Sequence, residues 1–81
     1  MKKNVWIIKG FGDSNPEKIS VSETVTVRDL KERYADELGV SSDEIEIATD
    51  TKRLNNNNSR VYDLVEDGET INILPRAYAG Y

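Results

Sequence analysis

With 81 residues, the chain is long enough for one small domain and too short for two. It contains neither cysteine nor histidine, which excludes disulfides, thiolate metal sites and the commonest general base, so we do not expect an enzyme. Its 11 basic and 15 acidic residues give a net charge of −4, which provides no basic field to attract a nucleic acid.

The first expected strand runs from Val5 to Lys9, where aromatic and β-branched residues form an apolar run. Alternation places Trp6 and Ile8 on one face of this strand and two further apolar residues on the other. Trp6 is large enough to contribute heavily to so small a core. If only one face meets a helix, about two large side chains remain on the other, either as ordinary surface or as a partner contact.

A second strand is expected at Lys18–Ser22, where polar and apolar residues alternate with period two. The intervening segment 10–16 is dense in turn-forming residues, including two glycines and a proline. The two strands therefore predict an opening hairpin with a long loop.

A capping-box pattern, Thr26 followed three residues later by Asp29, predicts a helix from Val27 to Leu38. Gly39 suits the left-handed position that ends a helix. The apolar residues fall at spacings of three and four and should share one face: Val27, Leu30, Tyr34 and Leu38. The remaining faces should carry the charged residues Arg28, Lys31, Glu32, Asp36 and Glu37.

The second half of the chain predicts two further strands, Glu44–Ala48 and Thr70–Leu74, with a short return strand that ends at Leu54. Residues 55–59, four asparagines and a serine, are interpreted as a polar loop that adds little to stability because it has nothing apolar to bury. Residues 60–64 suit one helical turn. The expected core comprises Ile19, Val21, Leu30, Tyr34, Leu38, Ile45, Ile47, Leu54, Leu64 and Ile73.

This order of elements resembles the β-grasp fold of ubiquitin over nearly the whole chain. The segment 22–25 looks like the strand-to-helix corner of ubiquitin, and Asp67–Pro75 is similar to the last strand of the small sulfur carriers. The resemblance implies an α+β fold, a mixed four- to five-stranded sheet packed on one helix. It also implies a ubiquitin-like domain at residues 1–75 and a flexible C-terminal tail at 76–81.

Proteins of this family present such a tail to an activating enzyme, which adenylates a backbone carboxylate inside a narrow tunnel. The resemblance implies that Gly80 carries this chemistry after removal of Tyr81, with the carboxylate of Tyr81 itself as the less favoured alternative. It also implies that Arg76 corresponds to the arginines of the ubiquitin tail. Ala79 stands where the family pattern has the first of two glycines, which disfavours formation of a thiocarboxylate.

The resemblance also maps the exposed apolar patch of ubiquitin onto Phe11, Glu46 and Leu74. Glu46 would charge the middle of that patch, so receptors of ubiquitin itself are not expected to bind. Phe11 would either contact a partner or fold back over the small core.

We therefore expect a small, acidic, monomeric ubiquitin-like protein modifier that is activated at its tail and conjugated to targets in the cytoplasm. Its partners would be an activating, conjugating or processing enzyme, or another protein. The alternatives are a non-covalent ubiquitin-like interaction module and a sulfur carrier protein for cofactor synthesis. No cofactor, metal, nucleic acid or membrane is expected as a partner, since no apolar run reaches the length of a membrane span.

Overall fold

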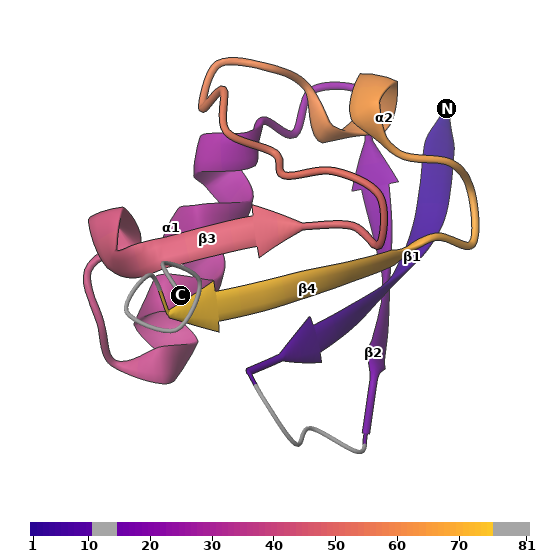
Figure 1. Cartoon of the computed structure of the whole chain (residues 1–81). Coiled ribbons are helices and arrows are strands. Elements are labelled where there is room, and N and C mark those ends of the chain that lie inside the picture. The colour runs from indigo at the N-terminus through magenta and orange to yellow at the C-terminus, as the bar shows by residue number, and fades with distance from the viewer. Residues whose placement is uncertain (11–14, 76–81) are drawn as a thin grey trace.

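The computed structural model of the chain describes residues 1–10 and 15–75 (Figure 1). Two strands form an opening hairpin, a long helix follows, and two further strands flank a short second helix. In chain order the elements are β1 (Lys2–Lys9), β2 (Glu17–Ser22), α1 (Val27–Leu38), the 3₁₀ turn η1 (Ser42–Glu44), β3 (Ile45–Ala48), α2 (Val61–Leu64) and β4 (Thr70–Pro75).

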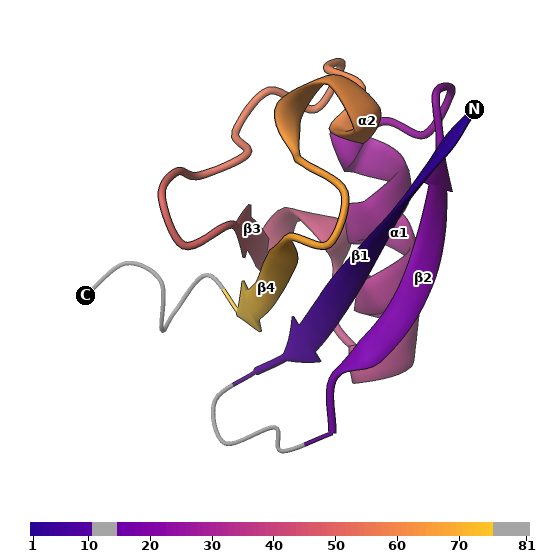
Figure 2. The same ribbon diagram turned by 90° about the vertical axis from the view of Figure 1, so that its right-hand side faces the viewer.

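The four strands form one mixed sheet in the order β2-β1-β4-β3. The two outer pairs are antiparallel, whereas the central strands β1 and β4 run parallel, with Trp6 opposite Thr70 and Ile7 opposite Ile71. A parallel pair cannot be joined by a tight turn, and here the chain between β1 and β4 includes α1. Figure 2 shows α1 crossing one face of this sheet. The expected α+β fold, a mixed sheet packed on one helix, is confirmed.

The bounds predicted for α1 are confirmed by its caps. The Thr26 side chain accepts a hydrogen bond from the Asp29 amide at 3.2 Å, and the Asp29 carboxylate accepts one from the Thr26 amide at 2.9 Å. Gly39 ends the helix with a φ of 72°, a conformation that a side chain would strain. Local sequence chemistry therefore fixes both ends of this helix.

The core lies between α1 and the sheet. Its buried apolar side chains are Val5, Ile7, Val21, Val27, Leu30, Tyr34, Ala35, Ile45, Ile47, Leu54, Val61, Val65, Ile71 and Ile73. Ile19 and Leu64, also expected in the core, are partly buried against it.

Two predictions about burial are wrong. Leu38 is 37% exposed because it is the last residue of α1, and the chain turns away at Gly39. Lys31, expected on a solvated face, is 7% exposed. Alternation left open which apolar face of β1 enters the core, and Trp6 is 41% exposed. Val5 and Ile7 occupy the inner side of β1 instead, so alternation leaves Trp6 on the other face.

The asparagine-rich loop at 55–59 is joined to α1 by its backbone. The Val27 amide donates to the Ser59 carbonyl at 2.9 Å, and the Arg28 amide donates to the Asn57 carbonyl at 3.2 Å. Amides in the first turn of a helix lack an intrahelical partner, so these two bonds fill a requirement of α1. The loop thus has a structural role that contradicts the expectation drawn from its composition.

The short return strand expected before Leu54 is reduced to a single bridge between Ala48 and Arg53. The Leu54 amide still donates to the Ile47 carbonyl at 2.8 Å, which brings the Leu54 side chain into the core.

Candidate interaction surface

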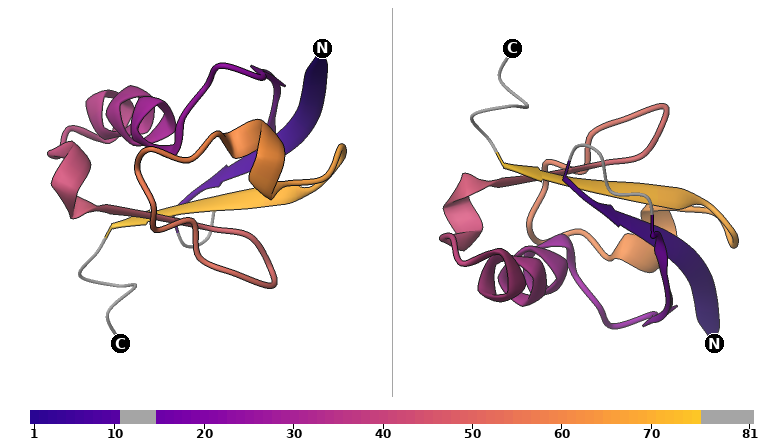
Figure 3. Two further views of the ribbon diagram at one scale, coloured as in Figure 1. Left: turned by 90° about the horizontal axis from the view of Figure 1, so that it is seen from above. Right: turned by 90° about the horizontal axis from the view of Figure 1, so that it is seen from below.

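We call the face of the sheet opposite α1 the outer face. It holds the candidate interaction surface. Both helices lie on the same side of β4, so among the described elements no helix covers the other side (Figure 3). Strand alternation and register assign the outer face these residues: Trp6, Ile8, Lys18, Glu46, Ala48, Asn72 and Leu74.

Trp6 is the most exposed apolar side chain of the outer face, on the central strand β1. Its cross-strand partner on β2 is Lys18, whose ammonium group lies 5.9 Å from the centre of the indole ring. This distance is within the range of a cation–π contact, which orients the ring without covering it. Ile8 on β1 and Leu74 on β4 are half-buried on the same face.

The structure brings together two of the three residues that the resemblance assigned to a recognition patch. Glu46 on β3 lies directly opposite Leu74 on β4 in the antiparallel register, and both side chains are half-buried. The third, Phe11, lies outside the described residues. The outer face thus has an apolar middle, with Lys18 toward one edge and Glu46 toward the other.

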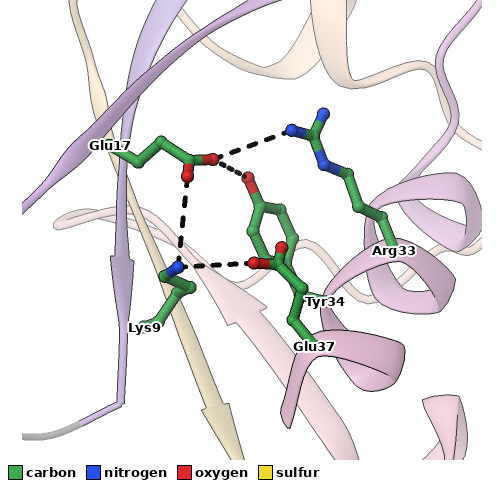
Figure 4. A network of polar contacts seen from close by, with 5 residues as sticks. All are labelled: Lys9, Glu17, Arg33, Tyr34 and Glu37. Carbon is green, nitrogen blue, oxygen red and sulfur yellow. Dashed lines mark hydrogen bonds and ion pairs between the residues drawn. The ribbon is translucent and has the colours of Figure 1, made fainter.

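On the helix side of the sheet, a polar network links the loop end of the opening hairpin, where β1 finishes and β2 begins, to α1 (Figure 4). The Tyr34 hydroxyl donates to the Glu17 carboxylate at 3.1 Å, and the Arg33 guanidinium lies 3.7 Å from the same carboxylate. The Lys9 ammonium lies 3.5 Å from Glu37 and 4.0 Å from Glu17. Periodicity placed Tyr34 in the core but could not reveal this network, because its members come from three different elements.

The family model described as ubiquitin-2 like Rad60 SUMO-like matches residues 7–74, which is most of the chain. The chain belongs to this ubiquitin-like family. No curated protein matches the sequence.

Solved structures show the same ubiquitin-like fold at low sequence identity. The ubiquitin of Caldiarchaeum subterraneum is 17% identical, with a TM-score of 0.75 over 94% of this chain and 95% of that chain. The ubiquitin-like domain of an Arabidopsis thaliana protein is 14% identical, with a TM-score of 0.71 over 93% of this chain and 78% of that one. At identities this low, the structural similarity supports the fold alone. That fold is the β-grasp arrangement that the sequence predicts.

The residues predicted for the conjugation tail of this ubiquitin-like chain, Arg76, Ala79, Gly80 and Tyr81, lie outside the described residues. Strand β4 ends at Pro75. Leu74 on the outer face is therefore separated from the tail by one residue, so the candidate surface adjoins the segment on which conjugation would depend.

Within residues 1–10 and 15–75, no helix is long and apolar enough to cross a membrane. In the same ranges, acidic, histidine and cysteine side chains form no group that could hold a metal ion.

The Tyr34 hydroxyl predicts how the stability of the ubiquitin-like domain depends on pH. Burial, together with the charge and hydrogen bond of Glu17 and opposed by Arg33, raises the pKa of Tyr34 from 10.0 to about 12. The folded state therefore holds this proton more tightly than the unfolded chain does. The stabilisation is fully present below pH 10 and is lost as the pH rises toward 12.

We expect Tyr34→Phe to lose less stability than the unmodified chain as the pH rises through this interval, because phenylalanine carries no titrating proton. Urea unfolding followed by circular dichroism at several pH values would measure the difference. Tyr62→Phe is the matched control and should retain the pH-dependent loss. Parallel curves for the Tyr34 variant and the unmodified chain would contradict the prediction.

Proposed function

We propose that this chain is a ubiquitin-like protein modifier whose C-terminal tail is activated and joined to targets, and whose outer face is recognised by protein partners. The observation that carries the proposal is the apolar group formed by the exposed Trp6 and the half-buried Ile8 and Leu74, on a face that no described helix covers. It lies on the two central strands, and the second of these leads directly into the tail.

Trp6 has the properties of a contact residue in a protein interface. A tryptophan that is 41% exposed provides a large apolar area and an N–H donor, and such side chains commonly dominate binding energies. Lys18 and Glu46, toward opposite edges, would favour one orientation of a partner that carries the complementary charges. These features support recognition by a protein.

The tail supports the covalent part of the proposal through its sequence. Its six residues, 76–81, can span roughly 20 Å when extended, enough to enter a recessed site while the domain stays outside. Hydrolysis of the peptide bond after Gly80 would free its carboxylate. A carboxylate oxygen would then attack the α-phosphorus of ATP and release pyrophosphate. Transfer of the acyl group to an amine of the target would release AMP.

The chief alternative is a non-covalent interaction module that uses the outer face alone. Tyr81 after the glycine favours this alternative, because the tail would need processing before conjugation. A sulfur carrier protein is a further alternative, but Ala79 before Gly80 departs from the double glycine of that family.

The tail is tested by ATP–pyrophosphate exchange with an activating enzyme from the native host. We expect a chain that ends at Gly80 to stimulate exchange and the same chain with Gly80→Val to fail, because the branched side chain blocks a narrow tunnel. If neither the Gly80-ended chain nor the full-length one stimulates exchange, the covalent proposal is overturned and the interaction module is favoured.

The outer face is tested in the same assay by a matched pair of substitutions. Trp6→Ser should raise the KM for the chain by about tenfold or more, because removal of a central contact residue commonly costs over 1.4 kcal/mol of binding. Leu38→Ser changes an apolar side chain of similar exposure on α1 and should leave the KM nearly unchanged. Equal effects of the two substitutions would contradict recognition through the outer face.

A further inference from the structure

The outer face carries opposite charges at two diagonal corners. Lys18 lies on the edge strand β2, level with Trp6. Glu46 lies on the opposite edge strand β3, level with Leu74, and Leu74 is four residues beyond the partner of Trp6 on β4, Thr70. With strands about 4.8 Å apart and residues about 3.3 Å apart along them, the two corners are separated by roughly 20 Å. The two charges are therefore too far apart to pair within one copy.

The centre of the outer face lies between these corners. Ile8 and Asn72 oppose each other there on the two central strands, and both are half-buried. The exposed Trp6 lies on one side of this centre, and the half-buried Leu74 lies on the other. A partner that fits this face needs an apolar centre between two opposite charges, which is the pattern of the face itself.

A twofold axis would make the pattern match itself. The axis lies in the plane of contact, passes through the centre of the face and runs at right angles to the diagonal. Each corner then meets the opposite corner of the other copy, so Lys18 of each copy faces Glu46 of the other. The same axis brings the two Ile8 side chains together and lays each Trp6 across β3 of the other copy, where Ala48 is small.

We propose that the outer face binds a second copy of this chain in a symmetric, face-to-face dimer. Reciprocal ion pairs between Lys18 and Glu46 surround an apolar centre. This inference rests on the outer face of the proposed function and names one partner for it, but it does not require conjugation. The dimer covers Trp6, so a copy within it cannot present this side chain to another protein.

The dimer is a weak one. The face between the corners measures roughly 14 Å by 13 Å, which is much less than the roughly 800 Å² that each partner of a stable complex contributes. The net charge of −4 on each copy also opposes association. Salt at about 0.15 M screens charges more than about 8 Å apart and so reduces this repulsion. The monomer expected from the sequence is therefore the form at low concentration, and the dimer accumulates as the concentration rises.

Dilution of the full chain, labelled with ¹⁵N, is the first test. The concentration falls from roughly 2 mM to 0.05 mM in about 0.15 M salt, a range that suits a weak interface. We expect the amide signals of residues 6–8, 18, 46–48 and 72–74 to move with concentration and those of α1 to stay in place. If no signal moves, or if the moving signals lie on α1, the outer face does not bind a second copy.

Charge reversal tests the pairing of the corners. Lys18→Glu places two carboxylates at each meeting point of its own dimer, and Glu46→Lys places two ammonium groups there. Each variant alone should associate at least about tenfold more weakly than the unmodified chain, because like charges that face each other across an interface repel. An equimolar mixture of the two variants restores opposite charges at both meeting points. The mixture should therefore associate about as tightly as the unmodified chain.

The matched controls change the net charge by the same amounts on the other layer of the domain. Arg28→Glu and Glu32→Lys alter exposed side chains of α1 and should leave self-association nearly unchanged, alone or mixed. A thermal melt of each variant shows that it is folded. If the mixture of outer-face variants associates no better than each variant alone, or if the controls weaken association equally, the reciprocal pairing is wrong.

These measurements need no activating enzyme, so they separate this inference from the proposed function. If the chain stays monomeric at every concentration while Trp6→Ser still raises the KM for activation, the outer face serves other proteins and the dimer is overturned. If the chain forms the dimer while Trp6→Ser leaves the KM unchanged, the dimer stands and recognition by the activating enzyme through this face is overturned.

Discussion

Replacing Leu30 with alanine should lower the free energy of unfolding by about 2–5 kcal/mol, a large share of the stability of a domain of this size. Leu30 is 3% exposed and belongs to the single core between α1 and the sheet. The substitution removes the apolar contacts of the side chain and leaves a cavity that its neighbours only partly fill. Urea unfolding followed by circular dichroism would measure the loss.

Leu38 offers a matched control on the same helix. It is the same residue type, but it is 37% exposed at the last position of α1. Leu38→Ala should therefore change the free energy of unfolding by no more than about 1 kcal/mol. Similar losses for the two variants would show that the buried face of α1 is assigned wrongly.

Deleting Asn57 and Asn58 should also destabilise the fold, although the sequence suggests a dispensable loop. The deletion removes the Asn57 carbonyl that accepts from Arg28 and shifts the Ser59 carbonyl that accepts from Val27. Each amide left without a partner in a buried environment costs about 1–3 kcal/mol, and Val27 is fully buried. A clear fall in the urea midpoint is the expected result.

The control for the deletion keeps the length of the loop. In the double variant Asn57→Ser, Asn58→Ser, the backbone groups that bond α1 remain, so stability should change little. If the deletion leaves the midpoint unchanged, or if the double substitution is as damaging as the deletion, the backbone bonds do not account for the role of the loop.

The sequence determined the local structure of this ubiquitin-like chain with little ambiguity. The capping box at Thr26 and the glycine at position 39 fix α1 because both signals act within a few residues of the helix ends. An apolar run located β1, and alternation located the other three strands, all to within three residues at each end, since side chains on a strand point to opposite faces in turn. The order of these elements was enough to predict the β-grasp fold.

Only the tertiary structure decided which of two apolar faces became the core. The alternation of β1 offers Val5 and Ile7 or Trp6 and Ile8 equally, and the choice depends on which side α1 covers. The pairing of Glu46 with Leu74 likewise depends on the register between β3 and β4. Periodicity records which residues share a face of one element, but it contains no information about the element that lies opposite.

The same limit explains the remaining differences between expectation and structure. Lys31 is buried although its helical position looks solvated, and it lines a cleft with η1 and the asparagine-rich loop. The loop lacks apolar side chains, yet its carbonyls complete the first turn of α1. These features depend on contacts between segments far apart in the chain. A polar residue acquires its role from the partner that the fold brings to it, and the sequence around it does not specify that partner.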